Sequence, residues 1–251
     1  MGCGQLSSEG SKSRRRGAVD LEVIIPAYNE AGRLPSTLSY TVDFLRTQTW
    51  SSRIVVVDNG SADDTGQIVR RMSTSNSEVP ISLIGCSRPG KGAAVRRGLL
   101  SGTSTYTGFF DADMATPLET LTAAMEHLAR GASAVIASRH SPGSTFVKRQ
   151  QFSRRLGGAA FRVVTSSMVR GVLDTQCGFK FFERGAILRA MVQSRTSGFA
   201  FDVELLRRLQ REGGRIIEIP VAWTDGTNST FHCVRDGIAS FVALAQMQRL
   251  P

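Results

Sequence analysis

The stretch Tyr106–Glu119, YTGFFDADMATPLE, joins a buried strand to the start of a helix and places two carboxylates between them. On an extended chain, residues two positions apart share a face, so Asp111 and Asp113 would point the same way and repel each other. A divalent cation bound between them, or between them and a phosphate, would offset this repulsion. A solvated turn that opens the next helix is the alternative for an Asp-x-Asp taken alone.

Short β-branched runs alternate with helical patterns on both sides of this stretch. The runs are LEVIIP (21–26), RIVVVD (53–58), ISLIG (81–85), YTGFFD (106–111) and ASAVIAS (132–138). Strands and helices in alternation predict an α/β fold, with a mostly parallel central sheet flanked by helices. We expect one α/β domain over 19–228, between a disordered basic arm (1–18) and a C-terminal amphipathic helix (229–251).

Carboxylates follow three of the predicted strands. Glu30 comes shortly after the first, Asp58 ends the second, and Asp111 with Asp113 follows the fourth. The carboxyl ends of parallel strands meet at one edge of a sheet, where open α/β folds bind their ligands. A helix cap or turn is the alternative for each acid alone. Together, the acids predict a ligand site at this edge.

The composition is that of a globular protein with a large basic excess. No window approaches 18 uninterrupted apolar residues, so we expect no transmembrane helix. Four widely separated cysteines form no CxxC pair, which argues against a zinc site or a disulfide framework and favours a reducing, cytoplasmic location. The formal charge of +10 suits phosphorylated substrates, an anionic membrane surface or nucleic acid. Few aromatic residues, with no basic residues interleaved among them, argue against nucleic acid.

Two segments have the composition of phosphate sites. GCSRPGKG (85–92) has the spacing of a P-loop, but Gly92 replaces the Ser or Thr that would hold magnesium, which argues against a P-loop NTPase. Its amide groups and Lys91 still suit a diphosphate, and an ordinary glycine-rich turn is the alternative. Further along, Arg149 and Ser153 would lie one helical turn apart and could grip one phosphate, unless they belong to a solvated basic face.

Six blocks stand in the chain in this order: EVIIPAYNE, VVVDNGSADDT, GKGAAVRRGL, DADMATP, DTQCGFKFF and GFAFDVELL. Together they resemble the inverting nucleotide-sugar glycosyltransferases of family 2, and within it the polyprenyl-phosphate sugar synthases, such as dolichyl-phosphate glucosyltransferases and dolichol-phosphate mannose synthases. The resemblance covers about Asp20 to Trp223. It implies a GT-A type fold, a nucleotide-sugar donor and a polyprenyl phosphate acceptor.

The resemblance also implies roles for single residues on the donor side. The base and ribose of the donor nucleotide would be held by Pro26, Tyr28, Glu30 and Asp58. Lys91 would lie beside the diphosphate. Asp111 and Asp113 would bind Mg²⁺ or Mn²⁺, with Asp113 as the more direct ligand.

On the acceptor side, the resemblance implies that Arg139, Arg149 and Ser153 cradle the acceptor phosphate. Ala115 departs from the mannose synthases, which often carry a metal-binding Gln at this position. DTQCGFK (174–180) is closer to the glucosyl relatives. The pattern therefore favours UDP-glucose over GDP-mannose or another UDP-hexose.

This chemistry explains the paired acids. A nucleoside diphosphate gains negative charge as it leaves, and a cation stabilises that charge as a Lewis acid. An acceptor phosphate is largely ionised at neutral pH and needs no general base. The same donor site could instead serve a soluble hydroxyl or amine, on a metabolite precursor or a carrier protein. A hydroxyl would need a base, for which Asp174, Asp202 and Glu204 are the candidates.

A non-catalytic nucleotide-binding or nucleic-acid-binding protein is the third alternative. We expect no nucleic acid partner and favour a cytoplasmic enzyme that lies peripherally on the inner face of the membrane. The C-terminal run supports this placement, since an amphipathic helix would turn one broad apolar face to anionic lipid. The alternative is a helix docked on the protein core. The residues of that face are Phe231, Val234, Ile238, Phe241, Val242 and Leu244.

Overall fold

The computed structural model describes residues 19–75, 78–146, 164–224, 240 and 242–246. Its strands are β1 (Leu21–Ala27), β2 (Ser52–Asp58), β3 (Ile81–Gly85), β4 (Tyr106–Phe110), β5 (Ala134–Ser138), β6 (Thr145–Phe146), β7 (Phe179–Glu183), β8 (Ile216–Pro220) and β9 (Ala222–Trp223). Within these ranges the central sheet has seven strands in the order β3-β2-β1-β4-β7-β5-β8, and β6 pairs with β9 in a small second sheet.

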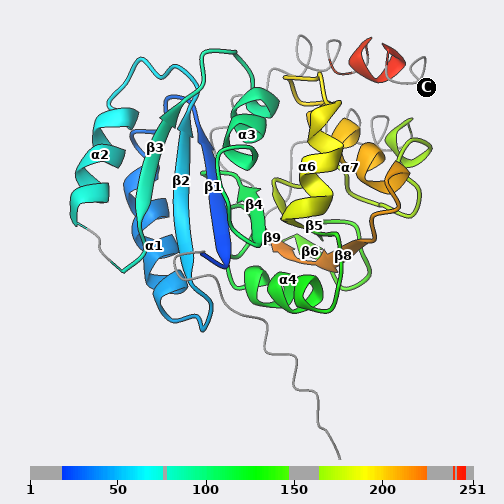
Figure 1. Ribbon diagram of the computed structural model, residues 1–251, viewed down its shortest axis with the longest axis horizontal. Helices are drawn as coiled ribbons and strands as arrows, with labels where there is room; N and C mark the ends of the chain where they lie inside the picture. The colour runs from blue at the N-terminus through cyan, green and yellow to red at the C-terminus, as the bar shows by residue number, and fades with distance from the viewer. Residues whose placement is uncertain (1–18, 76–77, 147–163, 225–239, 241, 247–251) are drawn as a thin grey trace, which may run out of the picture.

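Helices cover both faces of the central sheet (Figure 1). The core on one face receives side chains from α1 (Leu34–Arg46), α2 (Thr65–Ser75) and α4 (Thr120–Ala129). The core on the other face receives them from α3 (Lys91–Leu99), α6 (Arg184–Val192) and α7 (Phe201–Arg211). This three-layer arrangement follows from the alternation of strands and helices in the sequence.

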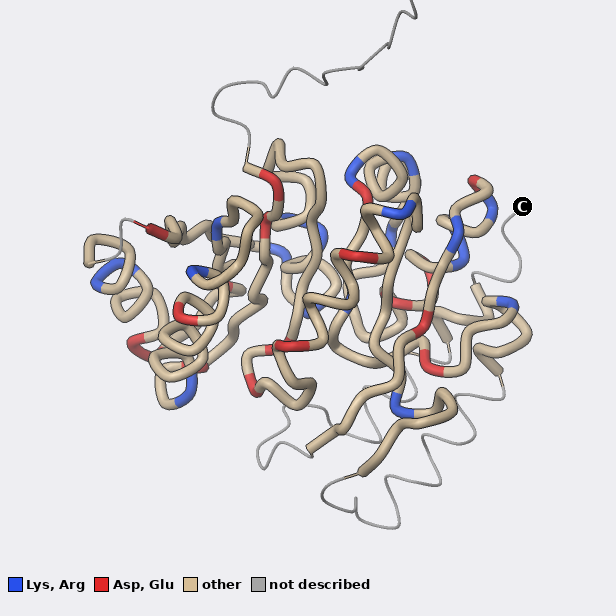
Figure 2. The backbone as a smooth tube through the Cα atoms, turned by 90° about the horizontal axis from the view of Figure 1, so that it is seen from below, with Lys and Arg blue, Asp and Glu red and all other residues tan. Residues whose placement is uncertain are grey.

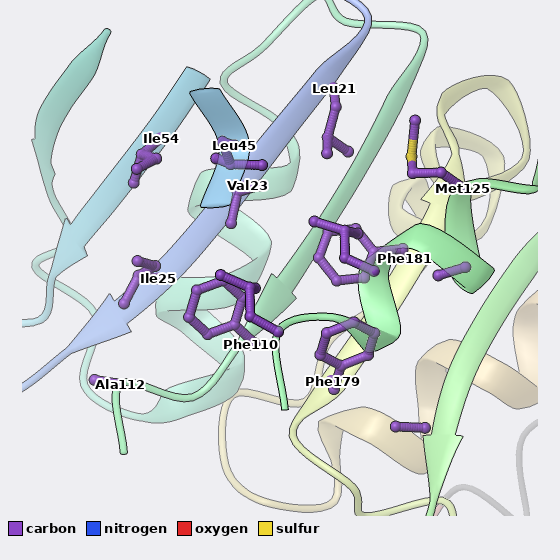
Figure 3. Packing of buried hydrophobic residues seen from close by; sticks show 14 of the residues in the cluster. Leu21, Val23, Ile25, Leu45, Ile54, Phe110, Ala112, Met125, Phe179 and Phe181 are labelled. Atoms are coloured by element: carbon purple, nitrogen blue, oxygen red, sulfur yellow. The ribbon is translucent and has the colours of Figure 1, made fainter. Parts of the chain in front are cut away.

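The inner strands are buried on both faces, which is why their sequences are almost continuously apolar. Val23 of β1 packs in one core with Phe110 and with Phe179 and Phe181, whose ring centroids are 4.8 Å apart (Figure 3). Ile24, the next residue of β1, joins the core on the opposite face. Successive side chains of a strand point to opposite faces, so one strand supplies both cores.

One strand of the central sheet runs against the others. β1 is parallel to β2 and β4, and β5 is parallel to β8, but β7 lies between β4 and β5 and is antiparallel to both. Gly108 of β4 makes this pairing close, because a Cβ at that position would lie 2.3 Å from the ring of Phe181. The expectation of a mostly parallel sheet is confirmed.

The described part of the C-terminal segment is helical at Ser240 and over 242–246. Leu244 is buried in the core on the α6 and α7 face, whereas Val242 is exposed. These two residues therefore do not share one exposed face, although the sequence placed both on the membrane-facing side. The basic arm and most of the predicted helix lie outside the described residues. Within the described ranges, no helix combines the length and apolar character needed to cross a bilayer.

Candidate active site

The acids at the strand ends meet where the order of the strands reverses. β1 is followed in the chain by β2 on one side of it, while β4 lies on its other side. The crevice outside the carboxyl ends of the strands at such a reversal is the usual ligand site of open α/β sheets. Glu30, Asp58 and Asp111 follow or end these three strands, so the structure brings the predicted acids to one rim.

The loops after β1 and β2 are joined by hydrogen bonds. The amide of Asn29 donates to the hydroxyl of Ser61 at 3.0 Å, and the amide of Ala62 donates to Oδ1 of Asn29 at 2.8 Å. The amide of Glu30 donates to the hydroxyl of Thr65 at 2.9 Å. Asn29 has a φ of 55°, in the left-handed region that Asn tolerates better than most residues. These contacts fix the backbone on which Tyr28 and Glu30 stand.

The predicted nucleotide contacts lie at the ends of β1 and β2 and in the loop that follows β1. Tyr28 is half exposed, and Pro26 lies within β1, opposite Val57 of β2. Asp58 is only partly buried, and its Oδ1 accepts a hydrogen bond from the amide of Ser61 at 3.0 Å. Asp58 therefore stabilises its own turn with one carboxylate oxygen. Its role toward a nucleotide base stays a prediction.

Asp111 and Asp113 stand on a short loop, Asp111–Thr116, which we call the acidic loop. The amide of Asp111 donates to the carbonyl of Gly178 at 2.9 Å, and the amide of Ala115 donates to Oδ1 of Asp113 at 3.1 Å. Met114 has a φ of 52°, a conformation that residues with a side chain adopt at a cost. A tightly held and locally strained loop thus carries both acids.

Lys91, at the start of α3, forms an ion pair with the first of these acids. Its ammonium lies 2.7 Å from Oδ1 of Asp111, and also 5.9 Å from the centre of the Phe109 ring. Burial disfavours the charged ammonium, but the carboxylates of Asp111 and Asp202 outweigh it and hold the pKa of Lys91 above its usual value. The structure therefore brings Lys91 and Asp111 together, and their roles toward a diphosphate and a cation stay predictions.

Glu30 and Asp113 lie in an acidic environment. Burial, together with the charges of Asp113 and Asp111, raises the pKa of Glu30, against the lowering effect of its ion pair with Arg33 at 2.7 Å. Desolvation and the charge of Asp111 likewise raise the pKa of Asp113, although its side chain still reaches solvent. Burial is the larger cause of both shifts, and the neighbouring carboxylates add to it.

The donor atoms at the rim suit a hard divalent cation. Carboxylate oxygens are the ligands that Mg²⁺ and Mn²⁺ prefer, and both Asp111 and Asp113 retain solvent access. Among the described residues, no group of three or more His, Cys, Asp or Glu side chains has the arrangement of a complete metal site. Magnesium is commonly bound by one or two carboxylates together with substrate phosphates, and the acidic loop fits that kind of site.

Two glycines of the glycine-rich loop, 85–92, pack closely against distant parts of the chain. A Cβ at Gly90 would lie 2.4 Å from the carbonyl oxygen of Ser197, and a Cβ at Gly92 would lie 2.4 Å from the Cβ of Phe201. The amide of Gly90 donates to Oδ1 of Asn59 at 2.8 Å, and the amide of Ala93 to the carbonyl of Ser197 at 3.1 Å. The amide of Gly90 is therefore engaged within the protein. A contribution of the Lys91 and Gly92 amides and of the Lys91 ammonium to a diphosphate stays a prediction.

Arg139 is committed to a buried carboxylate. Its Nε and Nη2 donate to the two oxygens of Asp174 at 2.7 and 2.8 Å, and its guanidinium carbon lies 5.4 Å from the centre of the Trp223 ring. Both side chains are desolvated, yet their mutual attraction dominates: the pKa of Asp174 is held well below its usual range and that of Arg139 above it. A direct contact between Arg139 and an acceptor phosphate stays a prediction.

Asp202 and Glu204, on α7, are also engaged. Oδ1 of Asp202 lies 2.7 Å from the ammonium of Lys180, a side chain that is 0% exposed. Glu204 accepts hydrogen bonds from the amides of Arg195 and Thr196 and forms an ion pair with Arg208 at 2.9 Å. Burial alone would raise the pKa of Glu204. The hydrogen bonds from these amides and from Arg208 lower it by more, so the net shift is downward.

Arg149 and Ser153 lie outside the described residues. The described ranges contain 20 basic and 18 acidic residues, a net charge of +2 out of the +10 of the whole chain. Figure 2 shows these charges interspersed along the chain. The basic excess of the sequence therefore belongs mainly to the segments 1–18 and 147–163, and the second includes both residues predicted for the acceptor phosphate.

Sequence reasoning missed several residues that shape the site. Arg33 pairs with Glu30, Asn59 holds the glycine-rich loop, and Gly178 lies against Asp111, where a Cβ would come within 1.9 Å of its carboxylate. Gly178 belongs to a quoted block, DTQCGFKFF, but its contact with the acidic loop depends on the pairing of β7 with β4. Only the folded chain shows that pairing.

Comparison with known proteins agrees with this geometry. Residues 22–193 match the family described as Glycosyl transferase family 2. A dolichyl-phosphate beta-glucosyltransferase from Dictyostelium discoideum is 33% identical over 217 residues, which cover 82% of this chain and 66% of that protein. Its counterpart from Saccharomyces cerevisiae is 34% identical over 237 residues, which cover 87% of this chain and 71% of that protein.

The fold has a solved counterpart. A crystal structure of glucosyl-3-phosphoglycerate synthase from Mycobacterium tuberculosis in complex with UDP matches with a TM-score of 0.69 at 17% identity, over 93% of this chain and 81% of that one. A second structure of that enzyme, with Mn²⁺, UDP and phosphoglyceric acid, matches with a TM-score of 0.68. These likenesses confirm the expected GT-A type fold. From the family match and the relatives together, the chain belongs to glycosyl transferase family 2 and is a glycosyltransferase.

Proposed function

We propose that this enzyme transfers glucose from UDP-glucose to a polyprenyl phosphate of the dolichyl type. Two observations support the donor and acceptor classes. The relatives that cover most of the chain are named dolichyl-phosphate beta-glucosyltransferases. The enzyme of the same fold from Mycobacterium tuberculosis was crystallised with UDP-glucose and Mn²⁺.

On the donor side, we assign the leaving diphosphate to the acidic loop and Lys91. A divalent cation bound by Asp111, Asp113 and diphosphate oxygens would supply Lewis acid stabilisation of the leaving group. The ammonium of Lys91, 2.7 Å from Asp111, is within reach of the same anion and would balance part of its charge. Tyr28, Glu30 and Asp58 would then bind the uridine on the loops after β1 and β2.

The observation that carries the choice of acceptor is the state of the three candidate bases. Asp174 is paired with Arg139, Asp202 with Lys180, and Glu204 with Arg208 and loop amides. All three carboxylates are buried. A general base must be within hydrogen-bond reach of the acceptor and free to take its proton. None of these three acids meets that requirement in the described structure, which favours an acceptor that needs no base.

A phosphate monoester is such an acceptor, because its second pKa is about 6 and it is already nucleophilic at neutral pH. It needs cationic and hydroxyl groups that place its oxygen opposite the leaving group. We assign this role to Arg149 and Ser153, in the segment 147–163 that carries much of the basic excess. A lipid-linked acceptor also places the enzyme at a membrane surface, where the same excess would attract anionic lipid.

The test is a donor-by-acceptor screen read by intact mass. UDP-glucose, other UDP-hexoses and GDP-mannose are each combined with polyprenyl phosphate, polyprenol and soluble alcohols, with Mn²⁺ or with EDTA. We expect a product only from the combination of UDP-glucose with polyprenyl phosphate. Its mass should exceed that of polyprenyl phosphate by 162 mass units, the mass of one anhydrohexose. Asp113→Asn is the control for contaminating activity. Transfer to an alcohol, with none to polyprenyl phosphate, would overturn the proposed acceptor and leave the donor site intact.

A further inference from the structure

We propose that Thr37 of α1 is a positioning residue for the acidic loop and sets its affinity for the cation. This inference rests on the proposed cation site at Asp111 and Asp113. Thr37 lies more than 70 residues before the loop in the chain and is only 4% exposed. Within the described part of the chain, its hydroxyl donates to neither acid but to the residue between them.

The contact is a short hydrogen bond from a side chain to the backbone. The hydroxyl of Thr37 donates to the carbonyl oxygen of Ala112 at 2.7 Å, and both residues are buried. The carbonyl of Arg33, 3.2 Å from the same hydroxyl, already accepts the amide of Thr37. A threonine hydroxyl has one proton to donate, and the shorter distance assigns it to Ala112.

The acidic loop needs such a restraint. Met114 holds a φ of 52°, so the loop would relax toward a commoner conformation if its contacts were loosened. Backbone groups hold it at its two ends, through Asp111 to Gly178 and through Ala115 to the amide of Thr224 at 3.0 Å. Thr37 holds it between these ends. Without the hydroxyl, the buried carbonyl of Ala112 loses this donor. The spacing of the two carboxylates is then no longer restrained by a contact with α1.

The same helix supplies a matched control. Thr41 lies one turn after Thr37, is 0% exposed, and donates its hydroxyl to the carbonyl of Thr37 at 2.7 Å. Replacing either threonine by valine removes a buried hydroxyl from α1 while its shape is kept. Only the change at Thr37 removes a hydrogen bond to the acidic loop. The difference between the two variants therefore isolates positioning from general destabilisation.

The experiment measures Mn²⁺ binding to the full chain with and without UDP, by the electron paramagnetic resonance signal of free Mn²⁺. Thermal melts of each variant are recorded beside it. Partners outside the ligand shell typically change metal affinity by about 10- to 100-fold, and we expect Thr37→Val to weaken binding by about tenfold. Thr41→Val should stay within about twofold of the unchanged protein, and Thr37→Ser should regain most of the loss because it restores the hydroxyl.

The outcomes separate this inference from the proposed function. If the unchanged protein does not bind Mn²⁺, either with or without UDP, the proposed cation site is wrong. If it binds them and Thr37→Val binds as tightly as Thr41→Val, the positioning role is wrong. Should Thr37→Val fail to fold, Thr37→Ala and Thr37→Ser are compared instead. Equal Mn²⁺ affinity for that pair would also overturn the inference.

Discussion

The ammonium of Lys91 lies 2.7 Å from one carboxylate oxygen of Asp111 and 2.8 Å from the other. This contact helps the chain to tolerate two acids two positions apart, because the ammonium offsets part of the charge of Asp111 and Asp113 turns one oxygen to the amide of Ala115. It also means that a cation competes with Lys91 for Asp111. A diphosphate, in turn, competes with Asp111 for Lys91.

Lys91→Met should therefore shift cation and nucleotide binding in opposite directions. Without the competing ammonium, Mn²⁺ alone should bind severalfold more tightly. UDP alone should bind about tenfold more weakly, the typical effect of losing one charged hydrogen bond. Calorimetry of each ligand separately checks both signs. Arg88→Met is the control, because Arg88 contacts the carbonyl of Arg195 rather than an acid of the rim. Unchanged affinity for both ligands would show that Lys91 is not at the site.

Asp113→Asn tests the cation directly. Its exposed carboxylate is the second acid of the proposed site, so the variant should lose most of its transfer activity, and EDTA should abolish turnover of the unchanged enzyme. The melting temperature without metal should not fall, because removing this charge also removes its repulsion with Asp111. Full activity in EDTA would contradict metal dependence, whatever the variant does.

Gly178→Ala tests the contact between β7 and the acidic loop. A Cβ there would lie 1.9 Å from Oδ2 of Asp111, so the carboxylate must rotate away. We expect weaker Mn²⁺ binding, by about tenfold, with a folded core, because the displaced group is the end of a side chain. Gly85→Ala is the control, since nothing lies within 4 Å of a Cβ at that position. Equal Mn²⁺ affinity in both variants would rule out this constraint.

The strands and the acidic rim could be predicted because each depends on local pattern. LEVIIP and RIVVVD are β-branched runs. Because they pair in parallel, Glu30 and Asp58 at their carboxyl ends lie at the same edge of the sheet. The direction of β7 could not be predicted, because FKFF reads as a strand whichever way it runs. The helix that follows the DxD stretch begins at Thr120, directly after a turn at Leu118 and Glu119.

The glycine-rich loop shows what a local pattern leaves out. Its composition is that of a phosphate cradle, but Gly90 and Gly92 also make room for Ser197 and Phe201, about a hundred residues away. Lys180 poses the same difficulty. A lysine in an apolar strand suggests an exposed edge, and only its buried ion pair with Asp202 explains it. Both features are set by tertiary contacts rather than by local sequence pattern.

Asp174→Asn should cost stability more than catalysis. The change leaves Arg139 buried without its carboxylate, and breaking such a pair typically lowers the free energy of unfolding by about 3–5 kcal/mol. Urea unfolding measures this loss. Glu126→Gln is the control, because its pair with Arg130 is exposed and should contribute under about 0.5 kcal/mol.

Asp174 also predicts that the protein loses stability at low pH. Burial opposes its charge, but Arg139 lowers the pKa of its carboxyl well below the ordinary value in the folded state. Its contribution to stability is therefore present above the unfolded pKa, about 3.9, and is lost as the pH falls toward the folded value. Unfolding measured from pH 5 down to pH 3 should show this loss in the unchanged protein and not in Asp174→Asn. Parallel curves for the two proteins would contradict the assignment.

A double variant at Lys180 and Asp202 would distinguish a phosphate acceptor from a hydroxyl acceptor that uses Asp202 as its base. Asp202→Asn alone is ambiguous, because it strands the buried ammonium of Lys180 and destabilises the fold. Removing both partners, as Lys180→Met with Asp202→Leu, avoids the unpaired charge and is often close to neutral for stability. With a phosphate acceptor, turnover per folded molecule in this double variant should fall only severalfold, through the lost support of Asp202 for Lys91. A general base contributes about 10²- to 10⁴-fold, so a hydroxyl acceptor deprotonated by Asp202 would lose turnover on that scale. The measurement is single-turnover transfer from UDP-glucose, normalised to the folded fraction from circular dichroism. A loss of a hundredfold or more in a folded double variant would make Asp202 the base and overturn the polyprenyl phosphate proposal.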